Sequence, residues 1–397
     1  MLRHSAITTC CLLLAGCSFG AAANRPSTPS ASPATSSSPT PSATGPASCA
    51  ERVFATLTFP QRVGQLFVIG LANDQLGPAE RQGIKTYHFG SVSFIVKTSA
   101  GVSGVRAVAN SVQAQATKAT TGGVRFYVAA NQEGGEIQSL QGAGFSGIPS
   151  AVAQGMMSTS TLEREAALWG RQLVEAGVNF NFAPVMDVVP PGTDSQNQPI
   201  GVLHREYGHD PQTVALHGLA FMQGMRQAGL ATSVKHFPGL GRVRGNTDFT
   251  AGVDDQVTTR NDPYLYPFAQ AIDAGVPFVM VALARYTRID SARLAVFSPV
   301  VMRRMLRQEL HFTGVIISDD LGASKAVGSI PTGQRAIDFL SAGGDMVISK
   351  FVGPAELMAQ AVLSRAAMDG SFRKRVDAAV LRILTAKQAS GRLPCAA

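Results

Sequence analysis

From Glu51 onward, the chain alternates short runs of almost continuous apolar or β-branched residues with longer amphipathic stretches. Strands of a parallel sheet are buried on both faces, so they read as continuous hydrophobic runs rather than alternating ones. Eight such runs occur, at Gln65–Gly70, Ser91–Val96, Arg125–Asn131, Phe180–Val188, Thr232–Phe237, Phe278–Leu283, Gly314–Ser318 and Asp345–Ser349. This alternation predicts an α/β protein of eight consecutive strand-helix units.

The stretches between the runs carry helix signals. Asp210 can cap a helix that begins at Pro211 and whose apolar pattern stops before Gly229. A second helix is predicted over residues 298–310, where apolar residues recur at helical spacing.

Two architectures accommodate eight such units, a closed (β/α)8 barrel of the TIM type and an open doubly wound sheet. Polar residues follow the carboxyl ends of several runs: Asn131, Asp187, Lys235, His236, Asp319 and Asp320. In a barrel these ends converge on one mouth, whereas an open sheet would spread them apart. We therefore expect a TIM-type barrel that forms a single catalytic domain over residues 49–397.

The first residues have the features of a targeting segment. Residues 1–17 contain a short apolar run, Ile7–Ala15, which is too short to span a bilayer and resembles a signal peptide. Small residues followed by Cys17 resemble a bacterial lipobox, in which the thiol receives a lipid. We expect an extracytoplasmic protein anchored to the bacterial cell membrane; an ordinary secretory signal with an incidental cysteine is the alternative.

Residues 18–48 consist almost entirely of Ser, Thr, Pro, Ala and Gly. Such a segment lacks the apolar surface that would offset the entropy of ordering, so we expect a disordered tether between anchor and domain.

Of the five cysteines, Cys49 and Cys395 remain once the signal segment is removed and Cys17 is lipidated. Outside the cytoplasm a disulfide is permitted, and the two ends of a barrel domain usually lie close together. A disulfide between Cys49 and Cys395 is predicted; two unpaired thiols at frayed ends are the alternative.

Composition limits the classes of partner. Hydrophobic residues make up 45% of the chain and charged residues 15%, as in a globular protein with a sizeable core. The net charge of +8 weakly favours an anionic envelope polymer or membrane surface, but no basic block with interleaved aromatics suggests nucleic acid. The sequence shows no histidine pair at helical spacing, no cysteine cluster and no nucleotide-binding glycine pattern, so neither a metal nor a cofactor is expected.

The seventh run leads directly into two carboxylates, Asp319 and Asp320. Adjacent like charges at a strand end are unfavourable unless they are used or solvated. Because successive side chains of a strand point to opposite sides, only one of the two can face the barrel mouth. One interpretation is a catalytic carboxylate, and the other is a pair that caps the following segment.

The fifth run ends in Lys235 and His236, which are hydrogen-bond donors suited to sugar hydroxyls, although Lys235 could instead pair with a carboxylate inside the barrel. The glycine-rich loop that follows, residues 240–255, carries Asp248. A mobile loop beside a barrel mouth suits a general acid, which must approach the leaving oxygen. A solvated surface position is the alternative for Asp248.

Two further polar residues lie near the expected mouth. Asp187 ends the fourth run and is expected to touch a ligand or, preferably, to brace Lys235. Arg205 could bind substrate hydroxyls, orient a carboxylate or form a surface salt bridge.

Taken together, these motifs resemble the single-domain β-N-acetylglucosaminidases of glycoside hydrolase family 3. The resemblance extends over nearly the whole domain, from Val63 to Met346. Its most specific segments are Gln132-Glu133-Gly134-Gly135, Asn181-Phe182-Ala183-Pro184, Lys235-His236-Phe237-Pro238-Gly239 and Ser318-Asp319-Asp320-Leu321. The resemblance implies that Asp319 is the nucleophile of a retaining glycosidase. With the residues at the strand ends, it implies a substrate site made of Lys235, His236, Arg205, Asn131 and Asp187.

The chain departs from the family pattern at several positions. The family draws its acid/base from an Asp-His dyad on the mobile loop; Asp248 matches the Asp, but Thr250 stands where the His belongs. Asn131 replaces an Asp, and Glu136 and Ser139 replace two Arg. Asp248 is therefore either an acid/base that acts alone, with its pKa raised by its surroundings, or a remnant of the dyad.

The resemblance implies an exo-β-N-acetylglucosaminidase that acts on peptidoglycan fragments in cell-wall turnover or recycling, and we expect the protein to be a monomer. Two alternatives stay open. The missing loop histidine would also suit a lipoprotein that binds glycans without cleaving them. The substituted substrate-binding residues would also suit a family 3 exo-hydrolase of another β-glycoside.

Overall fold

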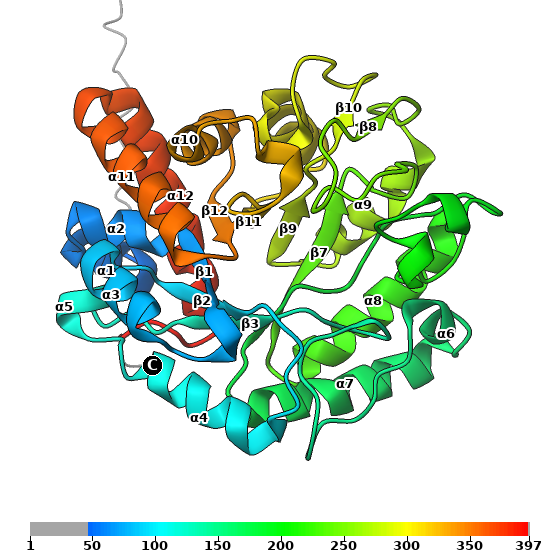
Figure 1. Ribbon diagram of the computed structural model, residues 1–397, viewed down its shortest axis with the longest axis horizontal. Helices are drawn as coiled ribbons and strands as arrows, with labels where there is room; N and C mark the ends of the chain where they lie inside the picture. Colours follow the sequence, from blue (N-terminus) through cyan, green and yellow to red (C-terminus); the bar gives the residue numbers. More distant parts are fainter. Residues whose placement is uncertain (1–46, 396–397) are drawn as a thin grey trace, which may run out of the picture. The chain divides into compact units, whose positions relative to one another are not determined.

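The eight apolar runs form a closed barrel of parallel strands in the computed structural model, which describes residues 47–395 (Figure 1). Around the barrel the strands follow the order β1, β12, β11, β9, β7, β6, β3 and β2. Their bounds are β1 (Phe67–Leu71), β2 (Ser91–Phe94), β3 (Tyr127–Ala130), β6 (Phe180–Asn181), β7 (Ala231–Phe237), β9 (Phe278–Val281), β11 (Val315–Asp320) and β12 (Met346–Ser349). Because β1 pairs with both β2 and β12, the sheet has no free edge, and the predicted (β/α)8 barrel is confirmed.

The predictions for the N-terminal segment, namely the signal peptide, lipidation of Cys17 and nearly all of the tether, lie outside the described residues. Between residues 47 and 395, no helix has both the length and the apolar character needed to cross a membrane.

One strand is much shorter than its apolar run. The run predicted over residues 180–188 pairs as a strand only at Phe180–Asn181. Pro184 has no N–H group to donate to a neighbouring strand, and beyond it the ladder continues only as a single bridge between Val185 and Lys235. The apolar residues after the strand are nevertheless buried, which explains the continuous run.

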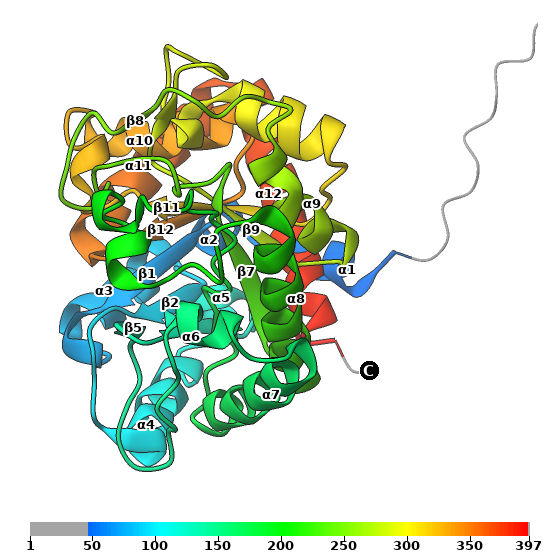
Figure 2. The ribbon, with the colours of Figure 1, turned by 90° about the vertical axis from the view of Figure 1, so that its right-hand side faces the viewer.

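Helices surround the barrel, and α7, α8 and α9 lie together on one side of it in Figure 2. The α-helices are α1 (Cys49–Thr56), α2 (Phe59–Gln65), α3 (Pro78–Tyr87), α4 (Gly101–Gln113), α5 (Lys118–Thr121), α6 (Ala151–Gly155), α7 (Thr159–Glu175), α8 (Pro211–Gln227), α9 (Tyr266–Asp273), α10 (Thr332–Ala342), α11 (Val352–Met368) and α12 (Gly370–Ala389). As predicted, α8 begins at Pro211, and the carboxylate of Asp210 accepts a hydrogen bond of 2.9 Å from the N–H of Thr213. The helix predicted over residues 298–310 is found at Val300–Glu309 as a π-helix.

Aromatic side chains fill the amino-terminal end of the barrel. Tyr127, Phe180 and Phe278 stand at the starts of β3, β6 and β9, and all three are buried. Their ring centroids lie 5.3 Å (Tyr127–Phe180), 5.6 Å (Tyr127–Phe278) and 4.3 Å (Phe180–Phe278) apart. This packed floor leaves the carboxyl ends of the strands as the place for a ligand.

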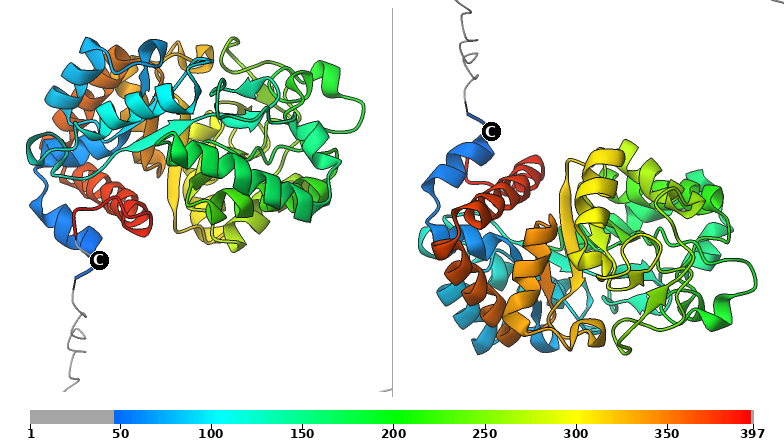
Figure 3. Two further views of the ribbon diagram at one scale, coloured as in Figure 1. Left: turned by 90° about the horizontal axis from the view of Figure 1, so that it is seen from below. Right: turned by 90° about the horizontal axis from the view of Figure 1, so that it is seen from above.

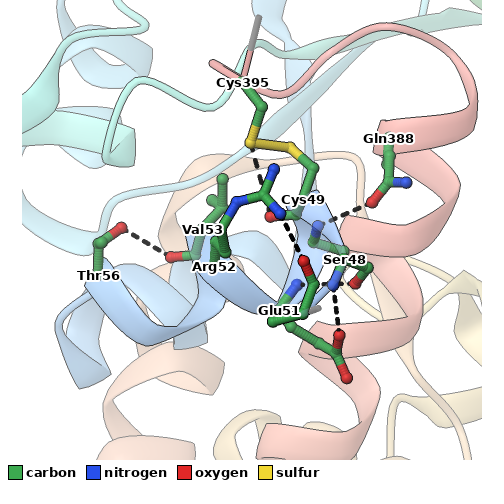
Figure 4. The surroundings of a disulfide bond; sticks show 10 residues. Ser48, Cys49, Glu51, Arg52, Val53, Thr56, Gln388 and Cys395 are labelled. Atoms are coloured by element: carbon green, nitrogen blue, oxygen red, sulfur yellow. Dashed lines mark hydrogen bonds between the residues drawn. A yellow bond between two sulfur atoms is a disulfide. The ribbon is translucent and has the colours of Figure 1, made fainter. Parts of the chain in front are cut away.

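The two ends of the domain are joined covalently. Cys49, at the start of α1, and Cys395 form the disulfide expected from the sequence, with the sulfur atoms 2.05 Å apart (Figure 4). The N–H of Ala50 also donates a hydrogen bond of 2.8 Å to the side chain of Gln388. As a result α1 packs against α12, as both views in Figure 3 show.

Two small sheets extend the loops above the barrel. An antiparallel pair, β4 (Gln132–Gly134) and β5 (Ile137–Gln138), follows β3 directly. A parallel pair joins β8 (Asp254–Asp255), after β7, to β10 (Arg285–Tyr286), after β9. Both pairs stiffen loops at the carboxyl ends of the strands.

Candidate active site

A cavity of about 330 Å³ opens at the carboxyl ends of the barrel strands. The structure brings together at this cavity most of the site residues predicted from the sequence: Asn131, Arg205, Lys235, His236, Asp248 and Asp319. They come from β7, β11 and the loops after β3, β6 and β7, so residues far apart in the chain meet at one mouth. Asp187 is the exception, because it is fully buried and does not line the cavity.

The adjacent carboxylates of β11 have different environments. Asp319 is partly exposed and lines the cavity, and its Oδ1 accepts a hydrogen bond of 2.8 Å from the N–H of Asp320. Asp320 is buried, and its carboxylate accepts hydrogen bonds from the N–H groups of Gly322, Ala323 and Lys350 at 2.9, 3.2 and 3.0 Å. Burial raises the pKa of Asp320 above its ordinary value. The structure thus gives Asp320 a capping role and leaves Asp319 available for chemistry.

Glu133 links the two cationic residues of the site. Both of its oxygens accept hydrogen bonds of 2.8 Å from Arg205, and Oε1 lies 2.6 Å from Nζ of Lys235. Burial disfavours the charged form of Glu133, but the positive charges of Arg205 and Lys235 outweigh it and lower the pKa to about 2. Glu133 lies in one of the most specific motifs of the sequence, but no role was predicted for it from the residue pattern.

The local sequence explains how Glu133 is held there. Gly134 and Gly135 adopt positive φ angles of 114° and 53°, which a residue with a side chain rarely reaches. They allow β4 to turn into β5 immediately after Glu133. Arg205 is fixed further by donating a hydrogen bond of 2.8 Å to the carbonyl of Pro199.

Lys235 is the most buried cation at the cavity, with 2% of its surface exposed. Its Nζ donates a hydrogen bond of 2.7 Å to Oδ1 of Asn131 in addition to the contact with Glu133. Burial lowers the pKa of Lys235 below its ordinary value despite the neighbouring carboxylate. The ion pair inside the barrel that the sequence left open as an alternative is therefore present, with Glu133 as the partner.

The expectation that Asp187 braces Lys235 was wrong. Asp187 accepts hydrogen bonds from the N–H groups of His236 and Leu240 at 3.1 and 2.8 Å, and its Oδ2 lies 2.7 Å from Nδ1 of His236. A carboxylate can only accept, so this contact places a proton on Nδ1 of His236 and orients the ring. The sequence had suggested that Asp187 binds substrate. The structure instead makes it a support for His236, which lines the cavity.

The loop that carries Asp248 is anchored at this point. Asp248 accepts hydrogen bonds from Ser324 at 2.7 Å and from Nζ of Lys350 at 3.0 Å. The carbonyls of Thr247 and Asp248 also accept hydrogen bonds of 3.1 Å from the N–H groups of Ala326 and Lys325. Burial disfavours the charged form of Asp248, but the charge of Lys350 and these hydrogen bonds prevail and lower its pKa. The raised pKa that an unaided acid requires is not found.

Three of the four positions that depart from the family pattern line the cavity, namely Asn131, Glu136 and Ser139. Glu136 forms an exposed ion pair of 3.3 Å with Lys97. Thr250 is exposed and does not line the cavity. Lys350, which sequence analysis did not single out, lines the cavity and is half-buried between Asp248 and Asp320.

Among residues 47–395, no group of three His, Cys, Asp or Glu side chains is placed to hold a metal ion. The polar groups that line the cavity are carboxylates, amides, hydroxyls, ammonium groups, an imidazole and a guanidinium. Such a set can bind a neutral, hydroxyl-rich ligand through many hydrogen bonds while one free carboxylate, Asp319, meets a reacting carbon.

A TIM barrel with a polar mouth and one available carboxylate has the arrangement of a glycoside hydrolase. Comparison with known proteins identifies the family: the chain belongs to the glycosyl hydrolase family 3 N-terminal domain, which it matches over residues 58–386. The resemblance noted in the sequence is therefore confirmed, and the chain is a glycoside hydrolase.

Individual relatives agree with this placement. The crystal structure of a β-N-acetylhexosaminidase from Beutenbergia cavernae is 44% identical, covers 84% of this chain and 99% of its own, and superposes with a TM-score of 0.82. A β-hexosaminidase from Methylococcus capsulatus is 33% identical over 62% of this chain and 73% of its own length. A β-hexosaminidase from Stenotrophomonas maltophilia is 30% identical over 71% of this chain and 82% of its own.

Proposed function

We propose that the protein is a retaining exo-β-N-acetylhexosaminidase that removes a terminal β-linked N-acetylglucosamine. The observation that carries the proposal is the position of Asp319, a partly exposed carboxylate in a cavity whose other charged side chains are held in ion pairs. The β-hexosaminidase relatives support the choice of sugar, since they match this chain over most of their own length.

The proposed chemistry is a double displacement. The carboxylate of Asp319 attacks the anomeric carbon, the bond from that carbon to the leaving oxygen breaks, and the leaving oxygen takes a proton from solvent water. A glycosyl ester of Asp319 remains. A water molecule then attacks the same carbon and loses a proton, the ester bond breaks, and the Asp319 carboxylate is restored with retention of configuration.

The buried polar residues would hold the terminal sugar. Lys235 is fixed by Glu133 and Asn131, His236 by Asp187, and Arg205 by Glu133 and Pro199. Groups fixed in this way lose little freedom when they bind hydroxyls, which favours a precise orientation of the anomeric carbon toward Asp319.

Asp248 suits the second step better than the first. Because its pKa is lowered, it is ionised at neutral pH and can accept the proton of the attacking water, but it holds no proton to give to a leaving oxygen. We therefore propose Asp248 as the base of deglycosylation. The first step would then favour leaving groups that need little protonation, since general acid assistance is typically worth about 10²–10⁴-fold.

We further propose that the natural substrates are peptidoglycan fragments, cleaved from the non-reducing end at the outer face of the cell membrane. The support is the signal peptide and lipobox expected within residues 1–17, the tether expected over residues 18–48 and the weakly favourable net charge of +8. Replacing Cys17 by Ser is expected to release the protein from membranes into the medium, and persistent membrane association would contradict the anchor.

A panel of aryl glycosides tests the activity. Release of 4-nitrophenol is expected from the β-N-acetylglucosaminide and not from the β-glucoside. A preference for the β-glucoside would support an exo-hydrolase of another sugar. Cleavage of neither aryl glycoside, with retained binding of N-acetylglucosamine, would support the glycan-binding alternative. The lowered pKa of Asp248 and the position of Thr250 outside the cavity also favour that alternative.

A further inference from the structure

Phe249 is a large apolar side chain left exposed at the cavity. It immediately follows Asp248, lines the cavity and has 79% of its surface exposed. Among the exposed large apolar residues of the described chain, Phe249 and Val96, at 44%, line this cavity, whereas the others lie elsewhere.

The exposure of Phe249 does not come from a loose loop. The carbonyl of Asn246 accepts hydrogen bonds of 3.0 and 2.8 Å from the N–H groups of Phe249 and Thr250. The side chain of Asn246 accepts another of 3.0 Å from the N–H of Asp248. With the bonds from Lys325 and Ala326 to the same segment, the backbone on both sides of the ring is fixed before any ligand binds. A side chain presented in this way loses little backbone freedom on binding.

The depth of the polar residues indicates which part of a substrate would reach the ring. Lys235 and His236, proposed to hold the terminal sugar, are 2% and 5% exposed, so the terminal sugar lies at the bottom of the cavity. Asp248, proposed as the base for the water that takes the place of the departed leaving group, is one residue from Phe249. The ring is therefore at the outer end of the cavity, where the leaving group must lie when an exo-acting enzyme holds its substrate.

The chemistry of the ring selects the kind of leaving group. In a β-linked pyranose the hydroxyls are largely equatorial, so each face of the ring presents C–H groups that carry a partial positive charge. The face of a phenyl ring is apolar and carries partial negative charge, so it packs favourably against such a surface. A small inorganic or methyl leaving group offers no comparable surface.

We propose that Phe249 forms a leaving-group subsite that takes a second pyranose ring, joined through the bond to be cleaved. The inference rests on the proposed function for the direction in which the substrate lies. It assigns the protein oligosaccharide substrates with a sugar on the reducing side, and it makes Phe249 a determinant of affinity for that sugar and not for the terminal one.

Binding to a variant that cannot turn over tests the subsite independently of catalysis. In the full-length protein carrying Asp319→Asn, the affinities of N-acetylglucosamine and of N,N′-diacetylchitobiose would be measured by calorimetry, with and without Phe249→Ala. Phe249→Ala is expected to weaken the affinity for the disaccharide by about 3- to 10-fold, the range of an aromatic contact. The affinity for the monosaccharide is expected to stay unchanged. Phe249→Trp should restore disaccharide affinity.

Phe351 provides a matched control. It is also an exposed phenylalanine, at 51%, and follows Lys350, but it does not line the cavity. Phe351→Ala is expected to change neither affinity. Unchanged disaccharide binding in Phe249→Ala, or an equal loss for both sugars, would overturn the subsite. Failure of the wild-type protein to cleave the disaccharide would instead count against the proposed function, and the binding comparison would still decide the role of Phe249.

Discussion

The ammonium group of Lys350 lies 3.0 Å from Oδ2 of Asp248, so the loop that carries Asp248 is joined to the end of β12 beside the nucleophile strand. The charges of Asp248 and Asp320 outweigh burial and raise the pKa of Lys350, while Lys350 lowers that of Asp248. Each charge thus keeps the other ionised. Asp248 thus has Lys350 as its charged partner in this structure, and this partner determines how Asp248 can act.

Replacing Lys350 by Met should move the acid limb of the pH-rate profile to higher pH. A group whose pKa is lowered in the folded protein stays ionised down to lower pH, and removing Lys350 takes away the largest of the interactions that lower the pKa of Asp248. If ionised Asp248 is the base, activity at pH 5 relative to pH 7 should fall. Other titratable groups near Asp248 are His236 on β7 and, through Lys350, Asp319 and Asp320.

A control for this prediction lies on the same segment. Lys325 is exposed and contacts Asp248 through its backbone N–H only, so Lys325→Met should leave the acid limb in place. The measurement is hydrolysis of the aryl β-N-acetylglucosaminide from pH 4 to 9. An acid limb that does not move in Lys350→Met would argue that Asp248 does not act as the base.

Replacing Glu133 by Gln should destabilise the protein strongly. Arg205 and Lys235 would keep their positive charges in a buried position without the carboxylate that pairs with them, and loss of one partner from a buried pair typically costs about 3–5 kcal/mol. Glu136→Gln, in the same loop, removes an exposed pair with Lys97 and should cost at most about 1 kcal/mol. Urea unfolding of both variants measures the difference; equal effects would contradict the central role of Glu133.

Glu133 should also contribute to acid sensitivity. Its pKa falls from an ordinary 4.5 to about 2 in the folded protein, so its stabilising contribution is complete above pH 4.5 and is lost as the pH falls toward 2. The unfolding free energy of the wild type should therefore decrease between pH 4.5 and 2 more steeply than that of Glu133→Gln. Parallel pH dependences of the two proteins would show that the carboxyl is not paired.

Replacing Glu206 by Gln should stabilise the protein at alkaline pH. Glu206 is buried, and burial followed by the proximity of Asp194 raises its pKa to about 8. A carboxyl with a raised pKa favours folding fully below its unfolded value of 4.5, and this contribution is lost as the pH rises through 8. Nδ1 of His209 lies 3.7 Å from Oδ1 of Asp194, so it is a further titratable group near Asp194. At pH 9 the melting temperature of Glu206→Gln should exceed that of the wild type by about 2–4 °C, with a smaller difference at pH 5.

Removing the disulfide should lower stability without altering the cavity. The bond between Cys49 and Cys395 encloses nearly the whole domain, and neither cysteine lines the cavity. Removing a disulfide typically costs about 2–4 kcal/mol of stability. Reductant should lower the melting temperature of the wild type and have no effect on a variant with both cysteines changed to Ser. A wild type insensitive to reductant would show that the bond does not form.

The barrel could be predicted from the sequence because its signal is local and repeated. A continuous apolar run identifies a strand buried on both faces without reference to the rest of the chain, and polar residues directly after such runs mark the mouth. The extent of β6 could not be predicted in this way. Residues 182–188 are as apolar as a strand, but they are buried as an irregular segment that contains Pro184.

The site was predicted in its members but not in its pairings. Arg205 and Lys235 were expected near the mouth, yet their common partner Glu133 lies on a hairpin beside the barrel, and only three-dimensional proximity reveals its role. Whether Asp187 reaches Lys235 or His236 depends on the path of the chain after β6, which no residue pattern encodes. Lys350 follows a strand as an ordinary solvent-facing lysine would, so its contact with Asp248 had no sequence signal.

The most direct test of the account is to trap the covalent intermediate. A 5-fluoro N-acetylglucosaminyl fluoride slows both steps but loses its anomeric fluoride readily, so it accumulates the glycosyl ester of a retaining enzyme. After digestion, mass spectrometry should find the sugar on the peptide that contains Asp319, and Asp319→Ala should remain unlabelled. Labelling of another side chain, or turnover by Asp319→Ala at the wild-type rate, would contradict the assignment of Asp319 as the nucleophile.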